Sequence, residues 1–352
     1  DYNTGWMNGD IKLATLSDTD DTDVTGSELV TNGTFDSDVS GWSAVDGTIA
    51  YSSGQALITR TGGSGLVAYQ DITTVVGSVY VLSGTTISTG TGEKVDLRAY
   101  DGSTMLANAA GIDNQTVQSS ATFTATSTTT RIWATVDSNG TATIDNVSVR
   151  LAEEDRSVNG NGLQVFGSIT KDPVASGADL VAYSGFSNLA NYLEQPYNSD
   201  LDFGTGDFCV IVWVKRSSNG SFNVFASRGG GGVNNRWAIY IDSSNVLKAA
   251  IREVGEDTIT GSTLPQDTWT HAALVRRNGV GYFYINGVLS ASASANRNLT
   301  NTVGTLKVGV DYDTSTAAAN GSVALLRVSA TAPSPEQIAK IYEDEKVLFQ
   351  EN

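Results

Sequence analysis

The stretch TWTHAALVRRNGVGYFYINGVL, residues 268–289, contains two apolar runs and two Asn-Gly pairs. The runs are Thr268–Arg277 and Tyr282–Ile285, and the Asn-Gly pairs follow them at 278–279 and 286–287. Asn-Gly is the preferred pair at the centre of a two-residue hairpin turn, because both residues must adopt a positive φ there. The stretch therefore predicts two consecutive β-hairpins in an antiparallel sheet.

Similar short runs recur on both sides of this stretch. Residues 28–151 contain runs at Lys94–Tyr100, Arg131–Val136 and, after the Asn-Gly pair at 139–140, Thr141–Val149. The second half adds the runs Phe208–Lys215, Trp237–Ile241 and Thr305–Val310. Period-two alternation at this spacing is typical of sandwiches and barrels. We predict an all-β fold of two tandem antiparallel β-sandwiches (jelly rolls) with one short C-terminal helix.

The helix is predicted at about residues 335–348. Ser334 is its N-cap, Pro335 takes the first helical position, and Gln337 is the capping-box partner of Ser334. The apolar residues that follow on one face are Ile338, Ile341, Tyr342 and Leu348. We therefore expect a short amphipathic helix that packs on the edge of a sandwich.

Composition divides the chain into four segments. Residues 1–26 are predicted to be an N-terminal strap and acidic linker, because four Asp residues lie between positions 18 and 23. Residues 27–151 form the first sandwich, residues 152–162 form a linker rich in acidic, Gly and Asn residues, and residues 163–352 form the second sandwich. Since the chain begins without Met and without a secretory signal pattern, we expect it to be a processed or excised piece of a longer protein.

Charge and residue inventory exclude several classes of function. The chain has 21 Lys and Arg against 38 Asp and Glu, a net charge of −17, which repels nucleic acid and anionic membranes. Its longest apolar run, Phe208–Val214, is far shorter than the ~20 residues that span a bilayer. One His (His271) and one Cys (Cys209) are too few for most metal centres and catalytic triads. We expect no enzyme activity, no nucleic-acid partner and no membrane insertion.

Residues 27–151 open with ELVTNGTFD at 28–36 and GW at 41–42, and they close with IDNVSV at 144–149. These paired segments resemble those of the jelly-roll carbohydrate-binding modules found beside glycoside hydrolases. The resemblance implies a structural Ca²⁺ ion held by acidic residues of both segments, at the positions of Asp36 and Asp145.

The closing strand agrees with this in one respect. The inward parity of Val147 and Val149 would place Asp145 inside and Ile144 outside, so we expect a break or bulge there. A buried carboxylate needs a cation or hydrogen-bond donors. The alternative is that Asp145 only caps a turn.

Four segments of residues 157–345 are similar to laminin-G-like domains of the concanavalin A type. They are LDFGTGDF at 201–208, VWVK at 212–215, WTHAALVR at 269–276 and YINGVL at 284–289. Glucanases of this wider fold carry two Glu and an Asp that alternate on one strand. The acidic clusters at 253–257 and 343–345 lack that spacing, so the second sandwich resembles the binding branch of the fold.

The opening residues 1–12, the two domains in this order and the closing residues 346–352 resemble segments of large bacteriophage structural proteins. The resemblance implies a fibre, appendage or decoration protein on the virion exterior, with other virion proteins as partners. A second copy of the chain, in a homo-oligomer, is a further candidate partner. Because such modules also occur in bacterial surface proteins, the bacterial cell surface is the alternative location.

Alternation in residues 94–100 and 131–136 directs apolar side chains inward and others outward. The outward candidates are Asp96, Arg98, Tyr100, Arg131 and Trp133. On one shared sheet face, the rings of Tyr100 and Trp133 would stack on sugar C–H groups and the charged residues would bind sugar hydroxyls. The alternatives are a solvated sheet face or an interface with a neighbouring subunit.

In the second sandwich, the same alternation directs Tyr240, Tyr282 and Tyr284 outward, where they could line a concave lectin-type sheet. Asp311 and Asp313 form an Asp-x-Asp pair that could bind Ca²⁺ from one loop, or that could simply belong to a turn. His271 is expected to be a structural, hydrogen-bonded residue, because no acid–base partner can be named for it.

These observations predict a non-catalytic virion protein that binds host-surface glycan through its sandwiches. The main alternative is a structural spacer or assembly module, of a virion or of a bacterial surface adhesin, whose outward aromatic residues pack against other proteins. A polysaccharide depolymerase would need an acidic pair that the sequence does not place.

Overall fold

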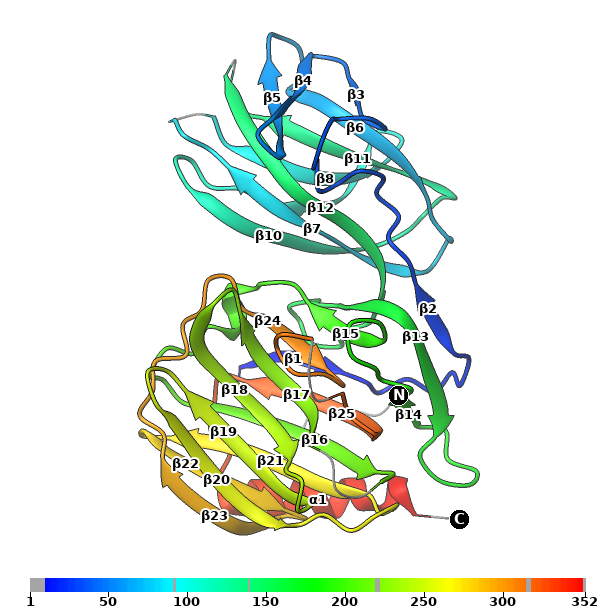
Figure 1. Cartoon of the computed structure of the whole chain (residues 1–352). Helices are drawn as coiled ribbons and strands as arrows, with labels where there is room; N and C mark the ends of the chain where they lie inside the picture. Colours follow the sequence, from blue (N-terminus) through cyan, green and yellow to red (C-terminus); the bar gives the residue numbers. More distant parts are fainter. Residues whose placement is uncertain (1–9, 91–92, 139, 219–221, 315–317, 351–352) are drawn as a thin grey trace. The chain divides into compact units, whose positions relative to one another are not determined.

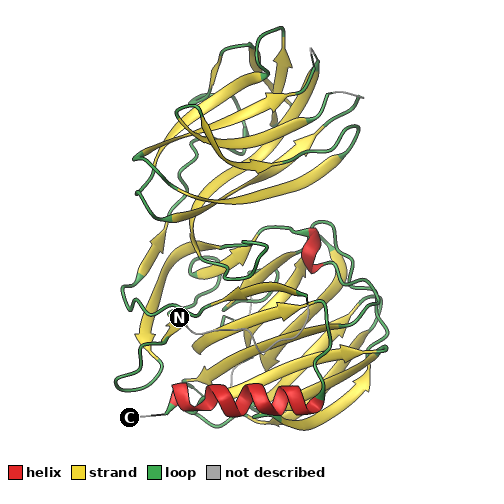
Figure 2. Ribbon diagram, turned by 180° about the vertical axis from the view of Figure 1, so that it is seen from behind, coloured by secondary structure: helices red, strands yellow, loops and turns green. Residues whose placement is uncertain are grey.

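The computed structural model describes residues 10–90, 93–138, 140–218, 222–314 and 318–350 (Figure 1). These residues are mostly antiparallel strands with one short α-helix, as the sequence predicts (Figure 2). The chain divides into two compact units. The first sandwich comprises Gly26–Ala152 and Pro196–Asn198, and the second comprises Asp1–Thr25, Glu153–Gln195 and Ser199–Asn352. Among the described residues, no helix has the length and apolar character to cross a membrane.

The first sandwich consists of two antiparallel sheets. The first, called the β11 sheet, contains β3 (Ser43–Ala44), β6 (Leu66–Thr73), β11 (Thr129–Val136), β8 (Val95–Asp101) and β9 (Thr104–Ala109), in that order. The other, called the β12 sheet, contains β4 (Gly47–Ser52), β5 (Gln55–Arg60), β12 (Thr141–Glu153), β7 (Val79–Ile87) and β10 (Thr116–Thr124). Apolar side chains from both sheets, such as Leu97, Ile132 and Val149, are buried together and form the core.

Strand β12 contains the irregularity that its sequence predicts. Its register with β7 shifts between Asp145 and Ser148, and Asn146 has a φ of 50°. This extra residue lets Ile144, Val147 and Val149 all face the core, where they are at most 3% exposed. Asp145 is thereby kept out of the apolar core.

The second sandwich also has two antiparallel sheets. In the first, called the β25 sheet, both β1 (Ile11–Thr15) and β14 (Val181–Ser184) pair with β25 (Gly321–Ser329), which is followed by β16 (Phe208–Arg216), β21 (Thr270–Arg277), β22 (Val280–Ile285) and β23 (Val288–Ser294). The other, called the β24 sheet, contains β13 (Leu163–Pro173), β15 (Tyr192–Gln195), β24 (Thr305–Val308), β17 (Asn223–Gly230), β18 (Val233–Ile241), β19 (Val246–Arg252) and β20 (Glu256–Thr263). The short strand β2 (Val24–Gly26) pairs with β13, and a 3₁₀ turn spans Ser199–Leu201.

The two hairpins predicted within residues 268–289 are present. Asn278 and Gly279 have φ values of 50° and 75° and join β21 to β22. Asn286 and Gly287 have φ values of 49° and 76° and join β22 to β23. Of the third pair, Asn139 lies outside the described residues.

Helix α1 (Pro335–Glu345) begins at the predicted capping box. The Ser334 hydroxyl accepts the Gln337 backbone N–H at 3.2 Å, and the Gln337 side chain accepts the Ser334 N–H at 2.7 Å. Its apolar face, with Ile338 and Ile341, packs on the outer side of the β25 sheet against Ile211 and other residues (Figure 2). A 3₁₀ turn, η2 (Lys346–Phe349), continues it.

Two segments that the sequence assigned to linkers are part of the second sandwich. Within residues 1–26, β1 is a strand of the β25 sheet. The apolar side chains of Leu13 and Leu16 are buried in the core of this sandwich. Within residues 152–162, the Asp155 carboxylate accepts the backbone N–H groups of Ala14 at 2.8 Å and Asn161 at 2.7 Å. Polar composition indicated linkers, but these polar side chains serve as hydrogen-bond partners for the folded chain.

Candidate functional site

A pocket of about 670 Å³ opens on the outer face of the β11 sheet in the first sandwich. Its lining residues are Leu66, Asp71, Tyr100, Asp101, Gly102, Ser103, Ser127, Thr129, Arg131 and Trp133. The sheet register creates this grouping, because Arg131 on β11 lies between Asp71 on β6 and Tyr100 on β8. Three of the five outward candidates from the sequence thus line one pocket.

The centre of the pocket wall is an ion pair stacked on aromatic rings. The Nε–H and Nη2–H groups of Arg131 donate to the two carboxylate oxygens of Asp71 at 2.6 and 2.7 Å. The guanidinium carbon lies 4.1 Å from the centroid of the Tyr69 ring, and that ring is 4.8 Å from the ring of Trp133. These contacts hold the donors and acceptors of the pocket in one orientation.

Asp71 and Arg131 each stabilise the charged form of the other. The hydrogen bond from Arg131 lowers the pKa of Asp71, and the bond to Asp71 raises the pKa of Arg131. Both side chains are about 40% exposed, so solvent screens the pair and its net contribution to folding is only about 0–1 kcal/mol. The Nη1 group of Arg131 donates to none of the described residues, which leaves it available to a ligand.

Other pocket groups are also poised for hydrogen bonding. Asp101 accepts the hydroxyl of Thr126 at 2.6 Å through one oxygen, and its other oxygen carries no bond to a described residue. Tyr100 is partly exposed, whereas Trp133 is only 7% exposed and offers little more than an edge. The arrangement combines a flat ring with several polar groups around a concavity, which is the usual composition of a small-ligand pocket.

Asp96 and Arg98 share this sheet face but do not line the pocket, which corrects the sequence expectation. Asp96 is fully buried; it accepts Nη2–H of Arg98 at 2.8 Å and the backbone N–H of Gly111 at 2.9 Å, and Lys94 lies 3.4 Å away. Arg98 also donates to Asn108 at 3.1 Å. The two residues therefore satisfy each other and the backbone, since a buried carboxylate requires such partners.

Tyr282 and Tyr284 do face outward from the β25 sheet, but they do not form an open binding surface. Helix α1 covers this face, and Tyr284 is 2% exposed in the cluster that contains Ile338 and Ile341. Tyr282 is partly buried at the margin of the same cluster. Strand alternation shows which way a side chain points, whereas the helix that covers it comes from elsewhere in the chain.

Tyr240 faces outward from the β24 sheet and is also mostly covered. It is 9% exposed and packs with Val224 and Ala250, while the half-exposed ring of Phe222 lies 4.9 Å from it. This patch therefore presents Phe222 rather than Tyr240 to solvent.

Asp36 and Asp145, the candidate Ca²⁺ ligands, lie close enough to interact. Burial raises the pKa of Asp145, and the negative charge of Asp36 raises it further. The hydrogen bond from the backbone N–H of Asn146 lowers this pKa and offsets part of the rise. The oxygens of Asp145 accept the backbone and side-chain N–H groups of Asn146 at 2.7 and 3.1 Å, and Asp36 accepts the hydroxyl of Thr34 at 2.9 Å. Carboxylate oxygens are ligands that Ca²⁺ prefers, and the ion takes six to eight oxygens, so these two residues would supply only part of a site.

The loop junction around these carboxylates is tightly built. Val147 N–H donates to the Gly33 carbonyl at 2.9 Å, and a Cβ at Gly33 would lie 1.9 Å from the Val147 carbonyl oxygen. Glu28 binds the same region, where it accepts Val149 N–H at 2.9 Å and the Ser148 hydroxyl at 2.7 Å. The opening and closing segments are therefore in direct contact. Across the described parts of the chain, no group of three or more His, Cys, Asp or Glu residues is arranged so that it could hold a metal ion.

Asp311 and Asp313 fit a cation less well. Burial raises the pKa of Asp311, and Asp313 adds to this effect, but Arg236 counteracts it. The guanidinium of Arg236 lies 4.3 Å from the ring centroid of Tyr312, between the two aspartates in sequence. A fixed positive charge beside the carboxylates competes with a metal ion for them.

The single His and Cys are both buried in the second sandwich. Burial, with the charge of Arg327, lowers the pKa of His271 to about 3, and burial raises the pKa of Cys209 to about 12. Neither ring nitrogen of His271 has a hydrogen-bond partner among the described residues, which corrects the expectation of a hydrogen-bonded histidine. Its ring instead packs against Trp213 and Tyr342.

The two acidic clusters outside the pocket are occupied by partners. Asp257 binds Arg297 through two hydrogen bonds of 2.8 Å, and Glu256 lies 3.7 Å from Arg236. In the helix, Asp344 pairs with Lys340 at 2.9 Å. These carboxylates form ion pairs with Arg and Lys side chains, and they do not form the open carboxylate pair across a cleft that a glycosidase needs.

Sequence reasoning missed two residues of β6, namely Asp71, which lines the pocket, and Tyr69, whose ring lies against the guanidinium of Arg131. The run Leu66–Thr73 alternates, and its outward positions include Tyr69, Asp71 and Thr73, so the same parity argument would have found the first two. Asp101, Ser127 and Thr129 carry no such signal, because they reach the pocket from strand ends and turns.

Part of the second sandwich matches a known protein family. Residues 188–339 match the laminin-G family model described as the concanavalin A-like lectin/glucanases superfamily. No curated protein sequence matches the chain significantly.

Several solved structures share parts of this architecture at low identity. The receptor-binding domain of botulinum neurotoxin C/D mosaic serotype is 14% identical, with a TM-score of 0.45 over 55% of this chain and 49% of that one. The binding domain of Paraclostridial Mosquitocidal Protein 1 is 16% identical, with a TM-score of 0.44 over 55% and 49%. The CBM40 of Ruminococcus gnavus IT-sialidase, solved with bound alpha2,3 sialyllactose, is 15% identical, with a TM-score of 0.36 over 40% and 84%.

The match to the botulinum domain covers about half of that domain's length. The second sandwich has a laminin-G-like fold of the concanavalin A lectin type.

Proposed function

We propose that the chain is a non-catalytic glycan-binding protein, and that its first sandwich binds carbohydrate in the pocket on the β11 sheet. The observation that carries the proposal is the convergence of Tyr100, Arg131 and Asp71 around a concavity of about 670 Å³. A sugar presents a C–H face to an aromatic ring and hydroxyl groups to carboxylate and guanidinium groups, so one ligand satisfies the whole set.

The charge of the pocket favours hydroxyl-rich ligands without acidic groups. Asp71 and Asp101 accept hydrogen bonds from hydroxyls, and they would repel a carboxylate or sulfate. Arg131 is already paired with Asp71, so it contributes N–H donors but little net positive charge. Residues 1–151 carry 17 acidic and six basic side chains, and this excess of negative charge also disfavours an acidic ligand.

Glycan-array screening of the whole chain with Ca²⁺ present tests the proposal. Tyr100→Ala and Arg131→Ala should each weaken binding to the best wild-type glycan by about tenfold, which corresponds to roughly 1.4 kcal/mol. Tyr51→Ala is the matched control, because Tyr51 is 46% exposed in the same sandwich but lies on β4 of the other sheet. Absence of binding to every glycan, or equal losses in the control, would overturn the proposal.

The rival function, a structural spacer or assembly module, predicts the opposite pattern. If outward aromatic residues serve an interface, Trp133→Ala weakens assembly with partner proteins and leaves adsorption to cells unchanged. If the pocket binds glycan, adsorption is lost and assembly persists. Release of reducing ends from a host polysaccharide would instead indicate a depolymerase.

We further propose the virion exterior as the location, in a bacteriophage fibre, appendage or decoration protein with other virion proteins as partners; a bacterial cell-surface adhesin is the alternative. The proposal rests on the order of the two sandwiches and on the opening and closing segments of the sequence. Of these segments, residues 1–9 and 351–352 lie outside the described structure. Antibodies raised against the chain should label intact phage particles. Labelling of uninfected bacteria would favour the surface adhesin instead.

We also propose a structural Ca²⁺ ion at the junction of the opening and closing segments of the first sandwich. Asp36 and Asp145 would hold it, since their mutual repulsion is what a divalent cation relieves. The ion would tie the two ends of the sandwich together. Because Arg236 competes at Asp311 and Asp313, the calcium proposal rests on the first pair.

A further inference from the structure

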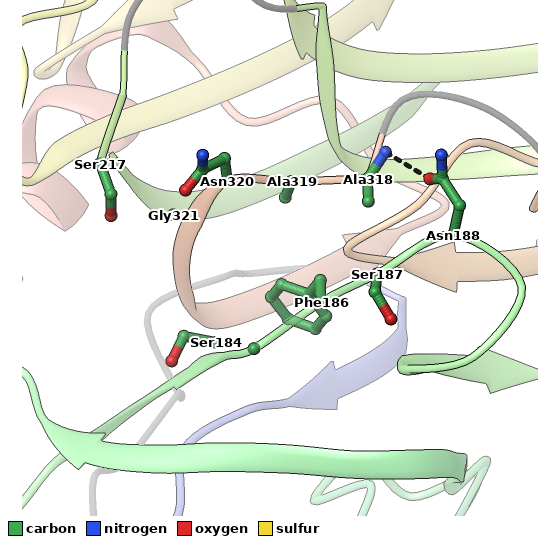
Figure 3. A pocket seen from close by; sticks show the side chains of 10 residues that line it. Ser184, Phe186, Ser187, Asn188, Ser217, Ala318, Ala319, Asn320 and Gly321 are labelled. Atoms are coloured by element: carbon green, nitrogen blue, oxygen red, sulfur yellow. Dashed lines mark hydrogen bonds between the residues drawn. The ribbon is translucent and has the colours of Figure 1, made fainter.

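A second pocket, of about 570 Å³, lies in the second sandwich (Figure 3). Its walls come from three connections that are distant in sequence. Residues 184–188 follow β14, Ser217 follows β16, and residues 318–321 lead into β25. All ten lining residues are among those that the structure describes.

The chemistry of this pocket differs from that of the first. Its ten lining residues include no charged side chain, although 17% of the chain is charged. The polar groups are the hydroxyls of Ser184, Ser187 and Ser217 and the amides of Asn188 and Asn320. Figure 3 shows the ring of Phe186 among these groups, below Ala319 and Asn320 in this view.

The position of Phe186 is built into the fold. The ring is 9% exposed, and a Cβ at Gly309 would lie 2.0 Å from it. Gly309 has a φ of +84°, a conformation that glycine adopts without strain. The glycine thus makes room for an aromatic ring at the base of the pocket.

The polar walls are held by hydrogen bonds that leave other groups unused. The Asn188 carbonyl oxygen accepts Ala318 N–H at 2.8 Å, and Asn320 N–H donates to the Asn223 side chain at 2.6 Å. The Asn320 amide nitrogen donates to Ser218 at 2.8 Å. The Asn188 amide nitrogen, the Asn320 amide oxygen and the hydroxyl of Ser217 then have no partner among the described residues. All three groups belong to exposed residues, so they are accessible to a ligand that both donates and accepts hydrogen bonds.

We propose that this pocket binds an uncharged sugar residue. An anionic ligand would find no cation in the lining, and a cationic one would find no carboxylate, so charged ligands would lose hydration without compensation. A neutral sugar has apolar C–H groups for the small exposed part of the Phe186 ring and hydroxyls for the amide and serine groups. The volume is within the range of small-ligand pockets. This site is independent of the pocket in the first sandwich.

The test uses the full chain and saturation-transfer NMR with the methyl glycosides of glucose, galactose, mannose and N-acetylglucosamine, and with a glucuronide and a sialoside as charged probes. Ser217→Trp fills the pocket from an exposed position and should abolish binding of the neutral glycoside. Asn320→Ala should weaken that binding about 3- to 10-fold. Ser290→Trp, at an exposed position on β23, is the matched control and should bind as the wild type does.

The same experiment separates the two pockets. Binding of the neutral glycoside should survive Arg131→Ala, which disables only the proposed site in the first sandwich. The inference is overturned if no neutral glycoside binds, if Ser217→Trp binds normally, if the charged probes bind equally well, or if only Arg131→Ala removes binding. Unchanged melting temperatures of the variants would show that a loss of binding is not a loss of folding.

Discussion

The carboxylate of Glu345 binds the guanidinium of Arg327 at the end of helix α1. Glu345 Oε1 lies 2.6 Å from Arg327 Nη1, and Oε2 accepts Nη2–H at 2.8 Å. Oε2 also accepts the indole N–H of Trp213 at 2.8 Å. The side chains of Arg327 and Glu345 are 2% and 14% exposed. The C-terminal helix is therefore fixed to the β25 sheet by a buried ion pair as well as by apolar packing.

Removal of this carboxylate should destabilise the second sandwich strongly. Glu345→Ala leaves Arg327 buried without its anion and Trp213 without its acceptor, so we expect the free energy of unfolding to fall by about 3 kcal/mol. Urea unfolding monitored by tryptophan fluorescence measures the change. Glu343→Ala is the control on the same helix, because Glu343 is 58% exposed and pairs with Lys346 at the surface; it should cost at most about 1 kcal/mol. Equal losses in both variants would contradict a special role of Glu345.

His271 should make the second sandwich sensitive to acid. Its pKa is lowered to about 3 in the folded chain, against a usual value of 6.5. Between these values the unfolded chain binds the proton and the folded chain does not, so stability falls as pH falls through this window. At pH 5 the loss relative to pH 7.5 should be about 2 kcal/mol, from roughly 1.36 kcal/mol per pH unit.

His271→Leu removes this term and keeps an apolar side chain of similar size beside Trp213. Urea unfolding at pH 7.5 and pH 5.0 should show a drop in stability that is about 2 kcal/mol smaller in the variant than in the wild type. Carboxylates titrate in both proteins and cancel in the difference. The same drop in both proteins would show that His271 is not buried as a neutral base.

Calcium should raise the melting temperature of the first sandwich. If the dissociation constant is on the order of 10⁻⁴ M, as in many extracellular modules, 10 mM Ca²⁺ adds about 2.7 kcal/mol of stability. Asp145→Asn should abolish this increase in a thermal-shift assay, whereas Asp313→Asn should leave it intact. A wild-type chain whose melting temperature does not respond to Ca²⁺, or an Asp145→Asn variant that still responds, would exclude the site at Asp36 and Asp145.

Gly33 should be intolerant of any side chain. A Cβ there would lie 1.9 Å from the Val147 carbonyl oxygen, so the opening and closing segments would have to separate. We expect Gly33→Ala to cost about 3 kcal/mol of stability, at the upper end for overpacking. Gly62→Ala, whose Cβ would meet nothing within 4 Å, should change stability by less than about 0.5 kcal/mol. Denaturant melts of both variants measure the difference, and equal stabilities of Gly33→Ala and Gly62→Ala would contradict a close contact between the two segments.

Local patterns were sufficient for the fold class, for the capped helix at Ser334 and for the direction of most side chains. Strand alternation directed Tyr100, Arg131 and Trp133 outward, whereas the pairing of β11 with β8 brings them onto one face, with Arg131 beside Tyr100. Alternation also required the bulge at Asp145. Such inferences succeed because the two-residue period of a strand and the first turn of a helix depend only on neighbouring residues.

The same patterns failed where a distant segment covers a face. Tyr284 points outward as its strand predicts, yet α1 closes over it about 55 residues later in the chain. Asp96 also points outward, yet partners from its own and a neighbouring segment bury it completely. Polar residues 152–162 were assigned to a linker, but Asp155 binds the backbone of β1. Exposure depends on what packs against a residue, and that is not a local property.

The amino-acid order alone thus specifies the strands, their inward faces, the hairpin turns and the helix cap, because each depends on short-range sterics and periodicity. The folded chain specifies which outward faces remain open, since coverage requires long-range packing. Thus Asp71 on β6 reaches Arg131 across 60 positions, and Asn188 meets Ala318 across 130. Both pockets exist because strand pairing and loop contacts bring such distant residues to one place.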